Sequence, residues 1–278
     1  MRQKTISREV FIKGQALHTG VDVEMRCAPA SGDAGIVFFR SDLPGSPAIP
    51  AMVSQVSDTR KCTAIGKGDA QIQTIEHFMA ALAALHLDNL HIYVHGPEIP
   101  LGDGSAGVFA RRLLEAGIEE QRAERKVAVL DEPVWAFQPL PSGKLASIVA
   151  LPAETPMYSY TFVSEHDALS DQYAEYSLDS GNFLAEIADA RTIAFMKEIE
   201  FLRKQGRALG GNMDIAVVVG EQGLLNPMRL PQEVARHKLV DLIGDLYLLG
   251  PVRARFIGIR SGHSLNNALA CKLAGILR

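Results

Sequence analysis

One order of elements occurs twice along the chain, and this repeat constrains the fold more than any other feature. Hydrophobic periodicity and turn residues predict a helix, a strand and a second helix in each half. The predicted elements are helix 74–85, strand 90–95 and helix 105–115, then helix 233–249, strand 252–259 and helix 264–277. Strand-like segments precede both sets, which favours helices gathered on one face of a sheet. We therefore predict an α+β fold with two domains of similar topology, each a β-sheet layered with α-helices.

A charged segment separates the two halves. Residues 119–126 (EEQRAERK) are predicted to form a connector, because a run of charged side chains suits a solvent-exposed link. We place the boundary near residue 125, which gives an N-terminal domain over 1–125 and a C-terminal domain over 126–278. In the first domain, Thr74 is expected to cap the helix that follows it.

The composition excludes several kinds of partner. The 278 residues include 28 Lys and Arg against 32 Asp and Glu, a net charge of −4, with no basic block, so we expect no nucleic acid partner. Three widely spaced cysteines, Cys27, Cys62 and Cys271, do not make a disulfide framework and fit a reducing cytoplasm. Neither a signal-peptide pattern nor an apolar stretch of roughly 20 residues is present. We expect a cytoplasmic monomer that meets lipid only at the membrane surface.

His237 and Asp241 stand four residues apart in the predicted helix 233–249. This spacing puts both side chains on one face, one turn apart, where they can bind the same divalent ion. A solvated helix face would account for an isolated pair equally well. The neighbouring residues are apolar nearly all round the helix, however, as in a buried helix. Buried charges need a partner or a metal, so the metal interpretation gains weight.

The matching helix in the first half supplies the third ligand. Glu76 and His77 stand side by side on an otherwise apolar helix. If the two helices face each other, His77, His237 and Asp241 form a three-ligand site with an open position. That pattern is typical of catalytic zinc, whose bound water has a pKa near 7. Glu76 is then the candidate general base, with a helix-surface carboxylate as the alternative.

Further polar residues near these positions have weaker signals. His263 opens the last predicted helix, where it can protonate a leaving group, stabilise an oxyanion or be an ordinary turn histidine. Lys238 and Asp245 flank the metal pair and can orient it. His18 lies in a glycine-bounded turn, where contact with a ligand and simple solvation both remain open.

Residues 102–107 (GDGSAG) match the dinucleotide pattern G-x-G-x-x-G. In a dinucleotide fold this pattern follows its strand directly, whereas residues 96–101 intervene here. Asp103 would also repel a phosphate. We interpret the segment as a tight turn with a helix cap.

The spaced motifs together resemble one family, the zinc-dependent UDP-3-O-acyl-N-acetylglucosamine deacetylases of lipid A biosynthesis in Gram-negative bacteria. The matching segments, in family order over nearly the whole chain, are Leu17–Gly20, Thr74–His77, Pro97–Pro100, Asp103–Ala106, Ala190–Thr192, Leu209–Gly211, Arg236–Lys238 with Asp241 and Gly244–Leu246, and Ser261–His263 with Asn266 and Asn267. The chain departs from the family at Ile193-Ala194-Phe195, where Phe-x-Phe is usual, and at Ser164, where an aromatic residue often contacts the uridine.

The resemblance implies zinc, or ferrous iron, held by His77, His237 and Asp241. It implies Glu76 as base and His263 as acid, with Asp245 holding His263. It further implies Thr192 as an oxyanion contact, Lys238 as a substrate contact and Cys62 near the mouth of the site. A C-terminal insert over about 193–211 would form an apolar passage for the acyl chain, with the candidate lining residues Phe195, Met196, Ile199 and Met213.

We therefore predict a cytoplasmic metal amidase that removes acetate from the 2-acetamido group of an acylated UDP-sugar. Water on the metal, deprotonated by Glu76, is the expected nucleophile, and His263 protonates the departing amine. A binding protein that holds the same ligand without turnover, and a dinucleotide oxidoreductase, are the alternatives. The first would not need Glu76 and the second would not need a metal.

Overall fold

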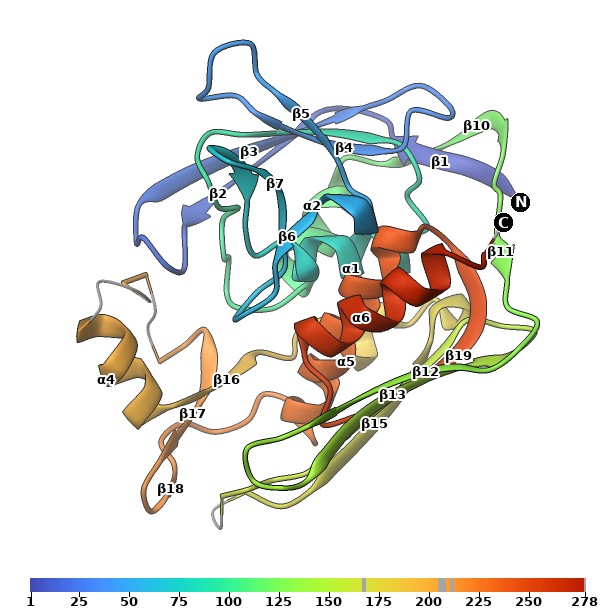
Figure 1. Cartoon of the computed structure of the whole chain (residues 1–278). Helices are drawn as coiled ribbons and strands as arrows, with labels where there is room; N and C mark the ends of the chain where they lie inside the picture. The colour runs from blue at the N-terminus through green and yellow to red at the C-terminus, as the bar shows by residue number, and fades with distance from the viewer. Residues whose placement is uncertain (167–168, 205–208, 211–212, 278) are drawn as a thin grey trace.

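The computed structural model describes residues 1–166, 169–204, 209–210 and 213–277. Two β-sheets enclose a layer of helices (Figure 1). The mixture of sheets and helices confirms the predicted α+β class.

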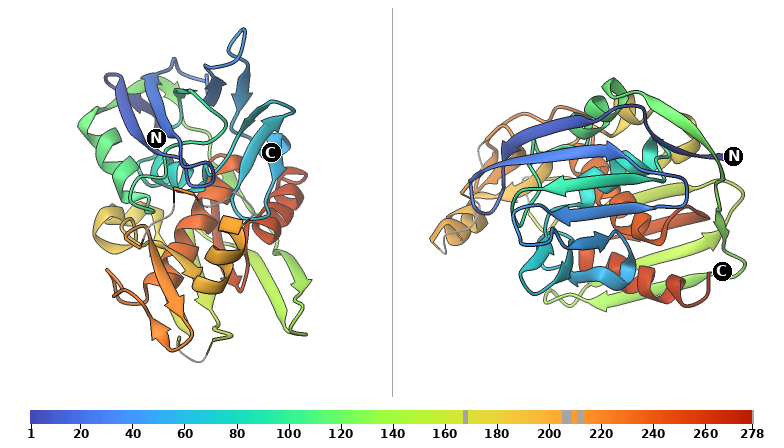
Figure 2. Two further views of the ribbon diagram at one scale, coloured as in Figure 1. Left: turned by 90° about the vertical axis from the view of Figure 1, so that its left-hand side faces the viewer. Right: turned by 90° about the horizontal axis from the view of Figure 1, so that it is seen from above.

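The upper sheet has the strand order β2-β3-β9-β4-β5 and is formed by residues of the first half (Figure 1). Its strands are β2 (Val10–Gln15), β3 (Asp22–Pro29), β4 (Ile36–Arg40), β5 (Ala48–Pro50) and β9 (Leu90–Val94). The right-hand view of Figure 2 looks down on these strands. β9 pairs antiparallel with β3 and parallel with β4.

The lower sheet repeats this arrangement with residues of the second half. Its main path is β12-β13-β19-β14-β15, and β19 pairs antiparallel with β13 and parallel with β14. The strands are β12 (Val134–Pro139), β13 (Leu145–Pro152), β14 (Met157–Phe162), β15 (Gln172–Ser177) and β19 (Val252–Ile259), and β11 (Ala128–Val129) also pairs with β19. The two sheets thus share strand order and strand direction. The division into domains at residue 125 stays a prediction.

Three smaller sheets complete the strands of the described part of the chain. They are β1 (Arg2–Ile6) with β10 (Ile118–Glu124); β6 (Val56–Asp58), β7 (Ala64–Lys67) and β8 (Ala70–Ile72); and β16 (Thr192–Phe195), β17 (Ala216–Gly220) and β18 (Gly223–Leu224). The predicted connector is wrong in its first part, because residues 118–124 form β10 and pair antiparallel with β1. That pairing satisfies the backbone of a segment whose side chains are mostly polar.

The helix layer lies between the two sheets, as Figure 1 and the left-hand view of Figure 2 show. The α-helices are α1 (Glu76–Ala84), α2 (Gly107–Glu115), α3 (Phe183–Glu186), α4 (Met196–Lys204), α5 (Glu233–Leu246) and α6 (His263–Ala274), and the short 3-10 helices are η1 (Val53–Gln55), η2 (Leu178–Ser180) and η3 (Tyr247–Leu249). α1 packs against α5, and α5 packs against α6. Every residue of α1 is buried, which explains why this helix is apolar nearly all round.

Several predicted bounds need correction. α1 begins at Glu76, and Thr74 does not cap it, because the Thr74 hydroxyl instead donates a hydrogen bond to Glu98. α5 ends at Leu246, and the predicted continuation is the 3-10 turn η3. Strand 252–259 has the predicted bounds. Within the described residues, the helices are too short or too polar to cross a bilayer.

Candidate metal centre and active site

His77, His237 and Asp241 meet at the contact between α1 and α5. His77 is the second residue of α1, and the other two lie one turn apart in the middle of α5. The Nε2 atoms of His77 and His237 lie 3.3 and 3.2 Å from the same oxygen, Asp241 Oδ1. All three side chains are buried. The structure thus brings together the predicted ligands, whose ligand atoms lie within 4.8 Å of one another.

The atoms in this cluster fit a cation. His237 Nδ1 lies 3.1 Å from the Ala190 carbonyl, a pairing in which Nδ1 carries the proton and Nε2 keeps its lone pair. Asp241 Oδ1 is buried and has no hydrogen-bond partner among the described residues. A lone pair and a carboxylate oxygen 3.2 Å apart repel each other unless a positive charge lies between them. Two imidazoles and one carboxylate are also the ligand types that zinc accepts.

Neighbouring residues hold the ligands in place. The other oxygen of Asp241 accepts a hydrogen bond from Lys238 Nζ at 2.9 Å. Burial opposes ionisation of Asp241, but His237 and Lys238 hold the pKa of this carboxyl well below its usual range. Arg191 forms a buried ion pair with Glu233, the first residue of α5, which fixes the segment that contains the Ala190 carbonyl.

Gly244 permits the close contact between the two helices. A Cβ atom at this position would lie 1.9 Å from the carbonyl oxygen of Glu76. Any other residue would therefore push α5 away from the start of α1, which carries Glu76 and His77. The sequence contained a signal for this role, because a glycine inside an apolar helix costs about 1 kcal/mol and needs a packing reason.

Glu76, the candidate base, lies beside the metal cluster as the first residue of α1. Its Oε2 accepts a hydrogen bond from the main-chain N–H of Thr63 at 2.9 Å. The side chain is buried, and burial raises its pKa above the ordinary value of a glutamic acid. A raised pKa makes the carboxylate a stronger proton acceptor.

His263 and Asp245 form a second charged pair across the helix layer. His263 Nδ1 lies 2.9 Å from Asp245 Oδ2, which also accepts a hydrogen bond from Asn266. Thr63 donates its hydroxyl hydrogen to Asp245 Oδ1 at 2.5 Å. Burial alone would lower the pKa of His263, but Asp245 raises it to about 10. No local sequence pattern indicates Thr63, which joins the site through contacts with residues distant in the chain.

The structure gives the surroundings of three further predicted site residues, Thr192, Cys62 and His18. Thr192 begins β16, next to the segment that His237 contacts. Burial, and then Glu76, raise the pKa of the buried thiol of Cys62 to about 12, so it stays protonated. His18 is buried, and its main-chain N–H donates to Glu98. Its carbonyl accepts a hydrogen bond from the main-chain N–H of Leu209, in the predicted insert.

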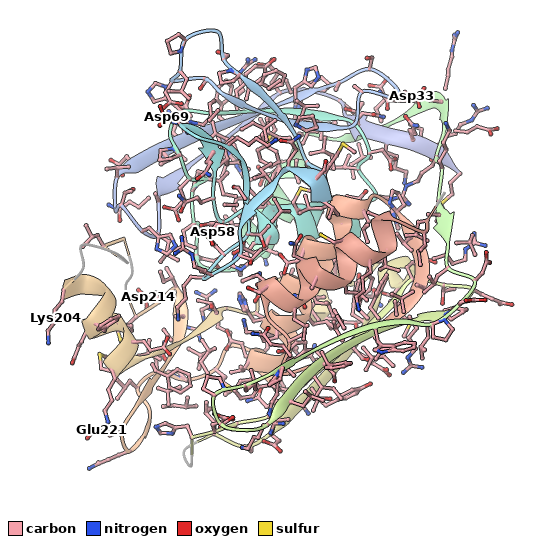
Figure 3. All side chains as sticks on the ribbon, viewed as in Figure 1. Asp33, Asp58, Asp69, Lys204, Asp214 and Glu221 are labelled. Carbon is pink, nitrogen blue, oxygen red and sulfur yellow. The ribbon has the colours of Figure 1, made fainter. Side chains whose placement is uncertain are left out.

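Two of the residues predicted to line an acyl passage pack on one apolar cluster, and the passage itself stays a prediction. Met196 and Ile199 of α4 pack against a small buried apolar cluster formed by Leu101, Ile215, Ala216 and Val218. The Phe195 ring lies instead beside His166, with 5.8 Å between ring centroids, and Met213 is 41% exposed. Figure 3 shows that Lys204 and Glu221, in the same part of the chain, lie at the edge of the molecule. Residues 205–208 and 211 of the predicted insert are outside the described residues.

The glycines of residues 102–107 serve packing. A Cβ atom on Gly104 would lie 1.9 Å from the Ile215 carbonyl oxygen, and one on Gly107 would lie 2.1 Å from Asp189. Asp103 accepts hydrogen bonds from Ser105 and Arg229. The predicted tight turn is confirmed at residues 102–103, and the segment contacts residues of the second half. The predicted helix cap is wrong, because Ala106 is the N-cap of α2 and makes no side-chain cap hydrogen bond.

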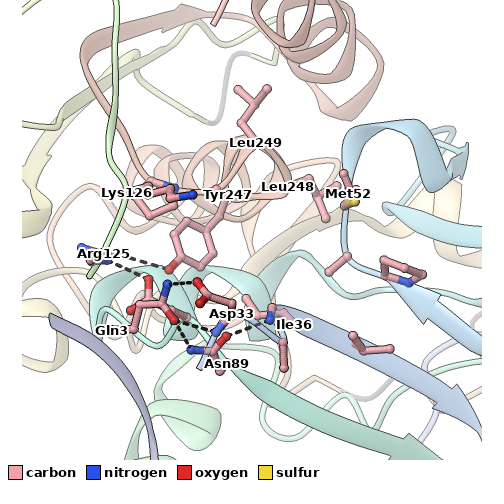
Figure 4. Close-up of a pocket in the computed structure, with 18 residues that line it drawn as sticks. Gln3, Asp33, Ile36, Met52, Asn89, Arg125, Lys126, Tyr247, Leu248 and Leu249 are labelled. Atoms are coloured by element: carbon pink, nitrogen blue, oxygen red, sulfur yellow. Dashed lines mark hydrogen bonds and ion pairs between the residues drawn. The ribbon is translucent and has the colours of Figure 1, made fainter. Parts of the chain in front are cut away.

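A hollow at the far end of α5 contains a different polar group (Figure 4). There the Arg125 guanidinium donates to Asp88 at 2.7 Å and to the Tyr247 hydroxyl at 3.3 Å. Gln3 and Asn89 bond to each other in the same hollow. Each of these polar side chains has a partner within the protein.

A buried His-His-Asp cluster beside a further carboxylate, in an α+β fold, is the arrangement typical of a metal-dependent hydrolase. A family model described as UDP-3-O-acyl N-acetylglycosamine deacetylase matches residues 3–275. The chain belongs to this family.

Similar proteins cover nearly the whole chain. A UDP-3-O-acyl-N-acetylglucosamine deacetylase of Nostoc sp. is 38% identical over 283 aligned positions, which cover 99% of each chain. Proteins of the same name from Anaeromyxobacter sp. and Myxococcus xanthus are 40% and 38% identical, over 98% of this chain and 88% and 86% of theirs. The predicted enzyme class, a hydrolase of the deacetylase type that cleaves an amide bond, is thus confirmed, and the family supports the predicted place in lipid A biosynthesis.

Proposed function

We propose that the chain hydrolyses the 2-acetamido group of UDP-3-O-(3-hydroxyacyl)-N-acetylglucosamine, releasing acetate and a free amine. The proposal is carried by one observation, the convergence of His77, His237 and Asp241 on a common point beside Glu76. The names of the similar proteins supply the substrate.

His77, His237 and Asp241 would hold the metal, zinc or ferrous iron. When bound, such an ion polarises the amide carbonyl and makes water acidic enough to react near neutral pH. Lys238 balances the charge of Asp241 and favours the ionised form of that carboxylate.

Glu76 takes the proton from the attacking water. Burial raises its pKa, and the Thr63 N–H fixes one of its oxygens. His263, kept positively charged by Asp245, stabilises the negative charge on the carbonyl oxygen and then protonates the departing amine. Thr192 adds a hydroxyl for the same oxyanion, and Lys238 contacts the substrate.

The acyl chain would lie along α4, over Met196 and Ile199, with Phe195 and Met213 as outer contacts. The apolar cluster under these residues supports this placement, since each buried CH₂ contributes about 0.8 kcal/mol. Cys62 and His18 are placed near the entrance. The enzyme would act in the cytoplasm as a monomer. It would meet lipid only at the membrane surface, from the aqueous side.

The test measures free amine released from a 3-O-acyl UDP-N-acetylglucosamine, with metal content determined on the same samples. Glu76→Gln keeps the shape of the side chain but cannot accept the proton, so kcat should fall on the order of 10²-fold or more at unchanged metal content. Glu132→Gln, at an exposed position, is the matched control. If the wild type binds metal and substrate without releasing amine, the chain is a binding protein and the proposal fails.

A further inference from the structure

Thr63 connects the two charged groups of the proposed active site. It lies between β6 and β7, is 2% exposed, and belongs to neither of the helices that carry the metal ligands. Its main chain is fixed to the start of α1, because its N–H donates to Glu76 Oε2 and its carbonyl accepts from the Ile75 N–H. Its side chain points the other way, to Asp245 on α5.

The hydroxyl has only one hydrogen, and Asp245 receives it. At 2.5 Å from Asp245 Oδ1, the Thr63 oxygen is the donor, because an ionised carboxylate only accepts. The same oxygen lies 3.4 Å from His263 Nδ1 and can face it only as an acceptor. The proton on His263 Nδ1 is therefore directed toward Asp245 and Thr63 together. This leaves Nε2 as the ring nitrogen that can act on the substrate.

Both oxygens of Asp245 thereby have hydrogen-bond partners. Thr63 occupies Oδ1, while Asn266 and His263 occupy Oδ2. Without the hydroxyl, a buried carboxylate oxygen would lose its donor, and the Asp245 carboxylate would be held through Oδ2 alone. The imidazole that Asp245 orients would then be held less firmly.

We propose that Thr63 is a positioning residue for the deacetylation. Its hydroxyl orients the Asp245–His263 pair, and its main-chain N–H holds the Glu76 carboxylate. This inference rests on the proposed function, in which Glu76 is the base and His263 the acid. Thr63 itself does not touch the substrate, so its loss should act on kcat and leave KM unchanged.

Two matched pairs of proteins isolate the effect of the hydroxyl. The first pair is the wild type and Thr63→Val, in which a methyl group of similar size replaces the hydroxyl. The second pair is Thr63→Ser and Thr63→Ala, which differ from each other only by the hydroxyl. In all of them the main-chain N–H to Glu76 is kept. Thr161→Val, the same exchange on β14 of the lower sheet, controls for the substitution itself.

Removal of the hydroxyl should lower kcat about 10- to 100-fold, the range expected for a hydrogen bond to a charged group. KM and metal content should stay within about twofold of the wild type, and Thr63→Ser should recover most of the rate. If Thr63→Val does not fold, the Ser and Ala pair gives the same comparison. Equal rates within either pair would overturn the proposal.

A readout without catalysis separates this inference from the proposed function. The Nδ1–H proton resonance of His263 reports its hydrogen bonds, and it should move in Thr63→Val and Thr63→Ala but return in Thr63→Ser. If the wild type releases no amine, the proposed function fails. The resonance alone then shows whether Thr63 orients the Asp245–His263 pair. An unmoved resonance in both hydroxyl-free variants would show that Thr63 does not position the pair.

Discussion

Two buried polar groups lie along α5, one at the metal cluster and one around Arg125 at the far end of the helix. In the second, the three guanidinium nitrogens of Arg125 contact Asp88, His86 and the Tyr247 hydroxyl, and the Tyr247 hydroxyl donates to the Leu87 carbonyl. The other oxygen of Asp88 accepts from the Lys4 N–H. Donors and acceptors are matched within the protein.

The metal cluster has the opposite character. His237 Nε2 and Asp241 Oδ1 are both acceptors, and they face each other at 3.2 Å. Gly244, the Arg191–Glu233 pair and the Ala190 carbonyl hold this arrangement in place, yet Asp241 Oδ1 accepts no hydrogen bond from any residue that the structure describes. Removing one partner from a buried charged group leaves the other charge uncompensated and is costly, whereas two facing acceptors without a donor between them favour a bound cation.

The largest effect should come from Asp241→Asn. The amide is neutral and a poor metal ligand, so metal content should fall from about one ion per chain to near zero, and the rate should fall by more than about 100-fold. Metal analysis and the amine-release assay on one preparation check this. Asp131→Asn, at an exposed position, serves as control. Retention of one metal by Asp241→Asn at the wild-type rate would contradict the metal assignment.

The residues that the sequence did predict carry local signals. His237 and Asp241 are one helical turn apart in a single element, and the two helices share an apolar composition that predicts their burial. Strand 252–259 has the predicted bounds because its side chains alternate between the helix layer and solvent.

What the sequence could not predict depends on contacts between distant segments. Thr63 meets Asp245 across 182 residues of chain, and no pattern around either residue indicates the other. β10 has mainly polar side chains and becomes a strand through its pairing with β1. Thr74 is a residue type that often caps helices, but its hydroxyl donates a hydrogen bond to Glu98 instead. Glu98 lies 24 residues further along the chain, so no local pattern around Thr74 includes it.

Arg125→Met should break the complete group without touching the metal cluster. The variant leaves Asp88, which is 10% exposed, without its charge partner, so the free energy of unfolding should fall by about 3–5 kcal/mol. Metal content and kcat should stay at wild-type values. Denaturant unfolding measures the first quantity, and Arg122→Met, at an exposed position, is the control. A loss below about 1 kcal/mol would show that the Arg125 group is not a stabilising unit.

The smallest expected effect is a pH dependence of stability from His86. Arg125 donates to His86 Nδ1, so this imidazole is neutral in the folded protein, and burial followed by Arg125 lowers its pKa. Below about pH 6.5 the unfolded chain takes up a proton here while the folded protein does not, so stability falls as pH falls.

His86→Gln removes this titration and should reduce the loss of melting temperature between pH 7 and pH 5.5. His95→Gln, which removes an exposed imidazole, should leave the loss unchanged. The experiment is best done with metal bound, because protonation of His77 and His237 competes with the metal and adds its own pH dependence. If His86→Gln and the wild type lose stability in parallel, Arg125 does not hold His86 in its neutral form, and the group around Arg125 is less complete than its hydrogen bonds indicate.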